Sequence, residues 1–131
     1  MASYYVEVEH QLKDGFLYIY INNYGREYDE DDDDPWDIPF YGDPKIAYYR
    51  ITYSIPDFEY EHFKARVLRY RHEEFREIGE EELDKLLTQT LSTASPWVHL
   101  EYMCIPAGIP LVYVGSKDVT WEEKAKAEGR E

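Results

Sequence analysis

Residues 4–21 carry the pattern of a β-hairpin, and this pattern constrains the fold more than any other part of the chain. Apolar residues alternate with glutamates over residues 4–9, which is the period of a strand with one buried face. Asp14 and Gly15 follow, and both residue types tolerate the positive φ angles of a tight two-residue turn. The partner strand, residues 16–21, is apolar on both faces, so its second face is either covered or forms an aromatic stripe.

Tyrosines dominate that second face. We expect Tyr18, Tyr20 and Tyr48 to share the sheet face away from the helix. Tyr is enriched in protein interfaces, so the stripe is one candidate contact surface. The alternative is a small aromatic core, covered by the next segment of the chain through Trp36 and Phe40. Both interpretations stay open.

The middle of the chain contains one clear strand and one ambiguous segment. Residues 45–55 predict a third strand, which Pro56 ends. In the segment 59–72, every second residue from 63 to 67 is apolar, which favours a strand. The apolar residues from 60 to 70 also fit helical spacings of three and four. We predict a strand here.

The last third predicts helices around a second hairpin. Residues 80–91 place apolar side chains three and four positions apart, as on one face of an amphipathic helix. The short apolar runs 97–105 and 109–114 predict a hairpin. Thr120 and Glu123 match a capping box that opens a short C-terminal helix.

These elements predict an α+β fold. Its mainly antiparallel sheet has about six strands, with one packed amphipathic helix and a short C-terminal helix. The length of 131 residues predicts a single domain over residues 1–131, and 44% hydrophobic residues provide for a core. An acidic loop insertion interrupts the strands at about residues 24–44.

The insertion holds the densest charge in the chain. Nine of the twenty residues from 24 to 43 are acidic and only Arg26 opposes them, a net −8 of the chain's −14. Such a block repels itself and is typical of an interaction tail or loop. Trp36, Ile38 and Phe40 offer an apolar foothold, so we expect a loop pinned at its C-terminal half.

The same run does not match a calcium loop. An EF-hand starting at Asp29 needs Gly at its sixth position and Glu at its twelfth, where this chain has Asp34 and Phe40. The four histidines belong to no HxH or HExxH pattern, and the single cysteine excludes a CxxC pair. We therefore predict no metal site and no cofactor.

Positive signs of catalysis are also missing from the sequence. There is no GxSxG, GxGxxG or P-loop motif, so we predict that the chain is not an enzyme. His72 beside Glu73 and Glu74 is the remaining candidate for an acid/base group. Cys104 lies in an apolar run and is interpreted as a buried small hydrophobe.

Net charge and composition bear on partner and compartment. A net −14 argues against direct binding of nucleic acid or an anionic bilayer and favours a basic protein. A lone cysteine, no membrane-length apolar run and an N-terminus unlike a signal peptide predict a cytoplasmic protein, in the host cytoplasm if it is viral. Few amides, Cys or Met among many charges is a thermophile pattern.

The acidic run can stand in for nucleic-acid phosphates. Alternate side chains of an extended chain lie about 6.6–6.8 Å apart, comparable to two phosphate steps of about 3.4 Å each along a DNA strand. The predicted partner-binding residues are Asp29, Glu30, Asp31, Asp32, Asp33, Asp34, Trp36 and Asp37.

The predicted function is therefore a small acidic inhibitor that binds a basic, nucleic-acid-binding protein. Mimicry of DNA or RNA is the mechanism that we consider for this binding. Anti-restriction and anti-CRISPR proteins of phages and archaeal viruses use this strategy, and the comparison with them is an analogy of charge and size. The alternative is a structural or homo-oligomeric interaction protein, for which a viral source is also considered.

One segment of this acidic chain is rich in basic residues. Lys64, Arg66, Arg69 and Arg71 lie close together in sequence. As a strand, the segment would point the first two to one face and the last two to the other. We weigh three roles for it: internal salt bridges, a phosphate site, or a face complementary to the acidic loop of another copy in a symmetric dimer.

Overall fold

In the part of the chain that the structure describes, four strands and three helices build the body of the protein, and a fourth helix follows the last strand. The computed structural model describes residues 3–27, 46–93 and 95–127. In these residues one antiparallel sheet has the order β1 (Ser3–Lys13), β2 (Phe16–Glu27), β3 (Ile46–Pro56) and β4 (Val112–Thr120). The helices are α1 (Tyr60–Tyr70), α2 (Glu80–Leu91), α3 (Pro96–Cys104) and α4 (Trp121–Ala127), and a 3₁₀ turn spans Asp57–Glu59.

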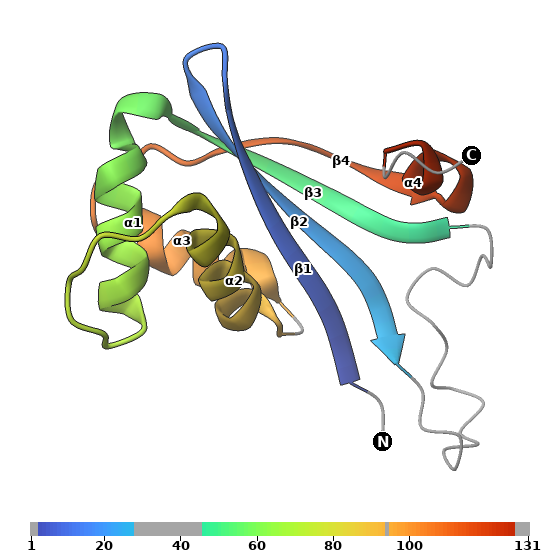
Figure 1. Ribbon diagram of the computed structural model, residues 1–131, viewed down its shortest axis with the longest axis horizontal. Helices are drawn as coiled ribbons and strands as arrows, with labels where there is room; N and C mark the ends of the chain where they lie inside the picture. Colours follow the sequence, from blue (N-terminus) through green and yellow to red (C-terminus); the bar gives the residue numbers. More distant parts are fainter. Residues whose placement is uncertain (1–2, 28–45, 94, 128–131) are drawn as a thin grey trace.

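The layers follow from the strand pattern. Helices α1, α2 and α3 lie together on one side of the sheet (Figure 1). Their buried side chains form one core with the strand residues that point to that side, including Leu17, Ile19 and Ile21 of β2. The predicted helix at 80–91 is confirmed as α2, which buries Leu83 and Leu87 in this core. The α+β class predicted from sequence is thus correct.

The N-terminal hairpin is confirmed. Lys13 of β1 pairs with Phe16 of β2, so Asp14 and Gly15 form a two-residue turn. Their φ angles are 53° and 85°, both in the left-handed region that this kind of turn requires. The predicted third strand is also present as β3, and it pairs with β2 from Tyr49 to Pro56.

The strand predicted at 59–72 is wrong, because this segment forms α1. Phe63, Val67 and Leu68 are buried on one side of the helix, at helical spacings. The alternation from 63 to 67 included Ala65, which is only half-buried and has no part in the core. Three alternating positions were too few to separate a period of 2 from a period of 3.6.

The hairpin predicted at 97–105 and 109–114 is also wrong. Its first half is helix α3, which Pro96 opens at a position where the missing N–H costs nothing. Its second half belongs to β4, which starts at Val112 and pairs with β3 instead. The first run buries Leu100, Met103 and Cys104. Periodicity alone cannot separate a helix from a strand in so short an apolar run. The sheet of the described residues therefore has four strands rather than about six.

The far face of the sheet is aromatic, as predicted. Tyr18 and Tyr20 stack along β2 with ring centroids 6.4 Å apart. The Arg50 guanidinium lies over the rings of both Tyr20 and Tyr48, at 4.7 and 5.6 Å from their centroids. Arg50 also pairs with Glu9 at 3.2 Å. The three predicted tyrosines therefore share this face, and an arginine joins two of them.

Helix α4 begins as the capping box predicts. The backbone N–H of Glu123 donates to Oγ1 of Thr120 at 3.2 Å. The Lys124 ammonium lies 5.1 Å from the ring centroid of Tyr24, which places α4 beside the aromatic face of β2. Across the described part of the chain, no helix is long and apolar enough to cross a membrane.

The two edge strands of the sheet are treated differently. Helix α2 runs beside β1, where the N–H of Val8 donates to Oγ1 of Thr88 at 2.9 Å. The Thr88 hydroxyl also donates to the carbonyl of Val8 at 3.4 Å, so this side chain of α2 occupies both outward backbone groups of Val8 in β1. No described residue pairs with the outer edge of β4, whose Val112, Tyr113 and Val114 are more than half exposed.

Candidate functional site

The residues predicted to bind a partner lie outside the described part of the chain. These are Asp29, Glu30, Asp31, Asp32, Asp33, Asp34, Trp36 and Asp37. Strand β2 continues to Glu27, so the predicted insertion at 24–44 starts a few residues too early. The structure gives the two ends from which the acidic segment, residues 28–45, departs.

Those two ends belong to neighbouring strands that separate before the segment begins. Strands β2 and β3 are paired up to Asn23 and Tyr49, and beyond this pair they diverge (Figure 1). The other end of β3, at Pro56, leads into the 3₁₀ turn and α1. With 11 residues at a rise of about 3.3 Å, β3 separates the two ends by roughly 30 Å. The acidic segment therefore departs from the end of the sheet remote from the start of α1 (Figure 1).

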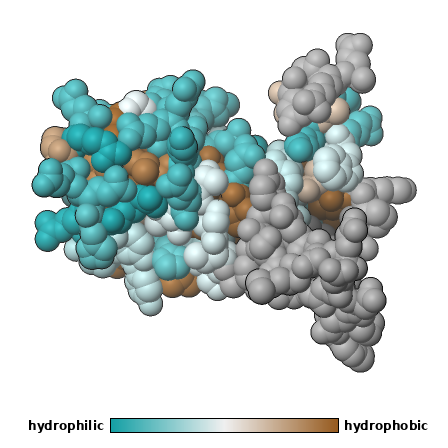
Figure 2. Space-filling view, turned by 60° about the horizontal axis from the view of Figure 1, so that its bottom comes forward, coloured by the Kyte–Doolittle hydropathy of each residue, from teal (hydrophilic) through white to brown (hydrophobic). Residues whose placement is uncertain are grey.

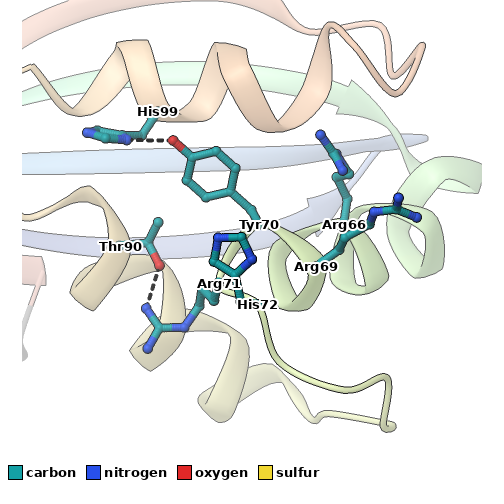
Figure 3. A pocket seen from close by; sticks show the side chains of 7 residues that line it. All are labelled: Arg66, Arg69, Tyr70, Arg71, His72, Thr90 and His99. Carbon is teal, nitrogen blue, oxygen red and sulfur yellow. Dashed lines mark hydrogen bonds between the residues drawn. The ribbon is translucent and has the colours of Figure 1, made fainter.

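A second candidate site is a hollow among the three packed helices. It has a volume of about 880 Å³, and basic and polar side chains from α1, α2 and α3 line it (Figure 3). The lining residues are Arg66, Arg69, Tyr70, Arg71, His72, Thr90 and His99. We refer to it below as the arginine hollow.

The end of α1 shapes this hollow. The N–H of His72 donates to the carbonyl of Arg69 at 3.0 Å, and the N–H of Glu73 donates to that of Leu68 at 2.9 Å. This is a Schellman end, which places one residue in the left-handed conformation. That residue is His72, with a φ of 60°, where glycine is the usual occupant. Its imidazole is one of the side chains that line the hollow (Figure 3).

Arg71 is fully engaged in holding the helices together. It donates to a Glu73 carboxylate oxygen at 2.7 Å, to Oγ1 of Thr90 at 2.7 Å and to the Gln89 side chain at 3.0 Å. Hydrogen bonds from Arg71, and then from Arg76, hold the pKa of Glu73 below its usual value. Arg71 thus ties the end of α1 to α2.

Arg66 and Arg69 are placed differently. Nε of Arg66 donates to the carbonyl of Met103 in α3 at 2.8 Å, which fixes the guanidinium without neutralising it. Arg69 lies one helical turn further on and is exposed. Among the described residues, neither arginine forms an ion pair, whereas Arg50, Arg71 and Arg76 each pair with a glutamate.

The same two arginines also line a neighbouring hollow of about 400 Å³. His62, Ala65, Pro106 and Ala107 complete its lining. Arg66 and Arg69 therefore stand between two concave surfaces, and ligands on either side can reach them. His62 of this hollow already contacts Glu59, because Nδ1 of its ring lies 2.8 Å from a carboxylate oxygen of Glu59.

A tyrosine and a histidine form the inner wall of the arginine hollow. The Tyr70 hydroxyl and Nδ1 of His99 are 2.7 Å apart, and the two rings meet edge to face. No described residue bonds the second ring nitrogen of His99. Tyr70 thus orients the imidazole and leaves one of its nitrogens for a ligand.

Only part of this site is visible in the sequence. Arg66, Arg69 and Arg71 form a basic patch there, but the predicted strand divided them between its two faces. On a helix, the spacing of three residues puts Arg66 and Arg69 on the same side. Thr90 and His99 carried no signal, because folding alone brings them to α1.

Two other polar groups carry structural roles. His10 is almost fully buried, with Nδ1 2.5 Å from a carboxylate oxygen of Asp84 and Nε2 3.0 Å from the Tyr60 hydroxyl. It joins β1 to α1 and α2, and burial raises the pKa of Tyr60. Cys104 is fully buried, which raises the pKa of its thiol to about 12. Within the described residues, no group of three His, Cys, Asp or Glu could hold a metal ion.

The surface around these sites is mainly polar. Figure 2 shows the helical part of the molecule covered largely by hydrophilic residues, with scattered hydrophobic ones among them. Comparisons with protein-family models, with curated proteins and with solved structures gave no match.

Proposed function

We propose that this protein is a small acidic inhibitor that binds a basic, nucleic-acid-binding protein through its acidic segment. The observation that carries the proposal is charge density: residues 24–43 hold a net −8 in a chain of net −14. Asp29 to Asp34 would contact lysines and arginines of the partner, while Trp36 would add an apolar anchor. A cytoplasmic location and the absence of a catalytic role belong to the same proposal.

The way the segment is attached supports this role. Both of its ends continue into long strands of one sheet, which pair with each other up to Asn23 and Tyr49. The segment is thereby anchored at both ends on one scaffold, which reduces the conformational entropy lost when it binds. The arginines of α1 lie toward the other end of β3, so they are remote from the strand ends that carry the segment.

The physical driving force would be release of ions from the partner. A groove that binds nucleic acid carries many lysines and arginines, which attract anions in solution. A row of carboxylates displaces those anions as phosphates do, so affinity falls steeply as salt rises. Steering between opposite charges would also speed association at low salt.

A matched pair of charge variants tests the proposal. The first changes Asp31, Asp32, Asp33 and Asp34 to Asn. The control changes the exposed Glu74, Glu77, Glu80 and Glu81 in the helical part of the protein to Gln. Both variants then have the same net charge of −10 over the whole chain. Partners are captured from host extract and eluted with rising salt. We expect the first variant to lose the partner at much lower salt, and the control to behave as wild type.

Two outcomes would reject the proposal. One is that the aspartate variant binds its partner with the affinity and salt dependence of the wild type. The other is that both variants weaken equally, since net charge rather than the acidic segment would then govern binding.

A homo-oligomeric interaction protein is the second candidate, and one observation favours it. Arg66 and Arg69 lack an ion pair among the described residues and lie toward the opposite end of the sheet from the acidic segment. Copies could therefore associate head to tail. Sedimentation without any other protein would then show a mass well above 15.7 kDa.

A further inference from the structure

We propose that the arginine hollow binds a small phosphate-bearing molecule, with Arg66 and Arg69 as the main contacts. This site is independent of the acidic segment and of the partner proposed for it. Its ligand class follows from charge, from the donors that converge on the hollow, and from its size.

Charge is the first argument. The chain has 28 acidic and 14 basic residues, so a carboxylate is available to most cations. Arg50, Arg71 and Arg76 each pair with a glutamate, but Arg66 and Arg69 pair with none of the described residues. Two like charges one helical turn apart repel each other. An anion between them would remove that repulsion.

Preorganisation is the second argument. The bond from Nε of Arg66 to the Met103 carbonyl fixes one guanidinium and leaves its terminal nitrogens for a ligand. Arginine binds phosphate through two parallel N–H donors, a geometry that suits this arrangement. Arg69 is exposed and lies one helical turn from Arg66, so its long side chain can reach a ligand that Arg66 holds.

Imidazoles supply the third argument. His72 occupies a left-handed position that glycine would adopt without strain. Such a residue is retained where its side chain is used, and its ring lies between the arginines of α1 and Thr90 (Figure 3). His99 leaves one ring nitrogen without a described partner. Donors thus surround the hollow on several sides, which suits a tetrahedral phosphate better than a planar carboxylate.

Size favours a small molecule over a polymer. A volume of about 880 Å³ falls within the range of about 300–1,000 Å³ typical of small-molecule sites. A nucleic acid strand would continue beyond the hollow past Glu73, Glu74 and Glu77, which would repel its phosphates. The net charge of −14 acts in the same direction.

Titrations with three probes test the proposal. Inorganic phosphate, a nucleoside monophosphate and the matching nucleoside are added separately to the intact protein, and binding is followed by calorimetry and NMR. We expect saturable binding of both phosphate compounds and none of the nucleoside. Binding of the monophosphate at least tenfold tighter than phosphate would mean that the hollow also holds the organic part. Equal affinities would identify a site for free phosphate.

Variants link the signal to the arginines. Arg69→Gln is exposed and should fold normally, and it should weaken phosphate binding about tenfold, the loss of one charge-assisted contact. Arg66→Lys keeps the charge but loses the paired donors, and we expect a severalfold loss. Lys117→Gln is the control, because Lys117 is exposed on β4, outside the lining of the hollow.

Three results would overturn the proposal. The first is no saturable binding of either phosphate compound up to about 10 mM, a bound on very weak affinity. The second is unchanged binding in Arg69→Gln. The third is a different occupant: a single-stranded oligonucleotide that binds far more tightly than the monophosphate, or self-association that Arg69→Gln abolishes.

Discussion

The acidic segment and the arginine hollow differ in how their charge is assembled. The segment collects eight of its carboxylates within 18 consecutive residues, 28–45, so the sequence alone reveals it. The hollow collects its cationic and imidazole groups from α1, from the turn that follows α1, and from α3. One site is a property of the chain, and the other is a property of the fold.

This difference has a physical consequence. A dense acidic run acts over a distance, since its charges add, and it suits an extended basic surface. Two arginines held by helices act at contact, through directed hydrogen bonds to a ligand of limited size. We therefore expect one broad, salt-sensitive interface and one small, geometrically defined site in the same protein.

Salt dependence gives the largest expected contrast. Partner binding through the acidic segment should fall by about 10³-fold or more between 50 and 200 mM salt, as for contacts with several charges. Phosphate binding in the hollow involves few charges at short range, and should fall by less than about tenfold. Both affinities are measured by calorimetry across a salt series. If the two affinities depend equally on salt concentration, the acidic segment and the arginine hollow do not bind by different mechanisms.

A pair of arginine variants separates structure from binding within the hollow. Arg71→Ala removes three hydrogen bonds that tie α1 to α2 and should lower the free energy of unfolding by about 2 kcal/mol. Arg69→Ala removes none of the described bonds and should change it by less than about 0.5 kcal/mol. Urea unfolding measures both. A large loss for Arg69→Ala would assign this arginine to the structural framework.

Alkaline titration tests the helical layer that supports the hollow. Burial raises the pKa of the Cys104 thiol to about 12 from its ordinary value of 9.0, so the folded protein holds this proton more tightly than the unfolded chain. Its contribution to stability is complete below pH 9 and decreases as the pH rises toward 12. The loss should be about 1.4 kcal/mol per pH unit above 9.

The control for this titration is Cys104→Ala. Its stability should decrease less steeply above pH 9, because tyrosines with raised pKa values titrate in both proteins and cancel in the comparison. Identical slopes would contradict the raised pKa of Cys104. At neutral pH, the wild type and Cys104→Ala should bind the partner of the acidic segment with the same affinity.

His72 gives the smallest expected effect and joins stability to binding. His72→Gly removes the cost of a left-handed non-glycine residue, and should raise the free energy of unfolding by about 1 kcal/mol. It also removes an imidazole from the hollow, so phosphate should bind severalfold more weakly. Thermal unfolding and calorimetry on one sample measure both. A gain in stability with no loss of binding would show that the imidazole is not a ligand contact.

The parts of the fold that sequence predicted correctly have strong local causes. The Asp14-Gly15 turn fixes the first hairpin, and the leucines of 80–91 repeat over three turns of helix. The failures lie at 59–72 and 97–105, where apolar residues fit more than one period. There the choice depends on which side meets the core, and only the packed structure decides it.

The arginine hollow illustrates the same limit. The basic residues of α1 were visible in the sequence, but His99 and Thr90 come from positions 20 to 30 residues further on. No short pattern relates them, because the packing of α2 and α3 against α1 brings them together. The number of charged residues can be read from the sequence, whereas the fold determines which side chains come together around one hollow.

The unequal edges of the sheet limit how this protein can polymerise. Strand addition is the usual route by which sheet proteins grow into fibrils, and it needs a free edge on each side of every added copy. Here the hydroxyl of Thr88 in α2 occupies both outward backbone groups of Val8 in β1. Pairing through β4 would therefore end with two copies joined edge to edge, and growth by strand addition would stop there.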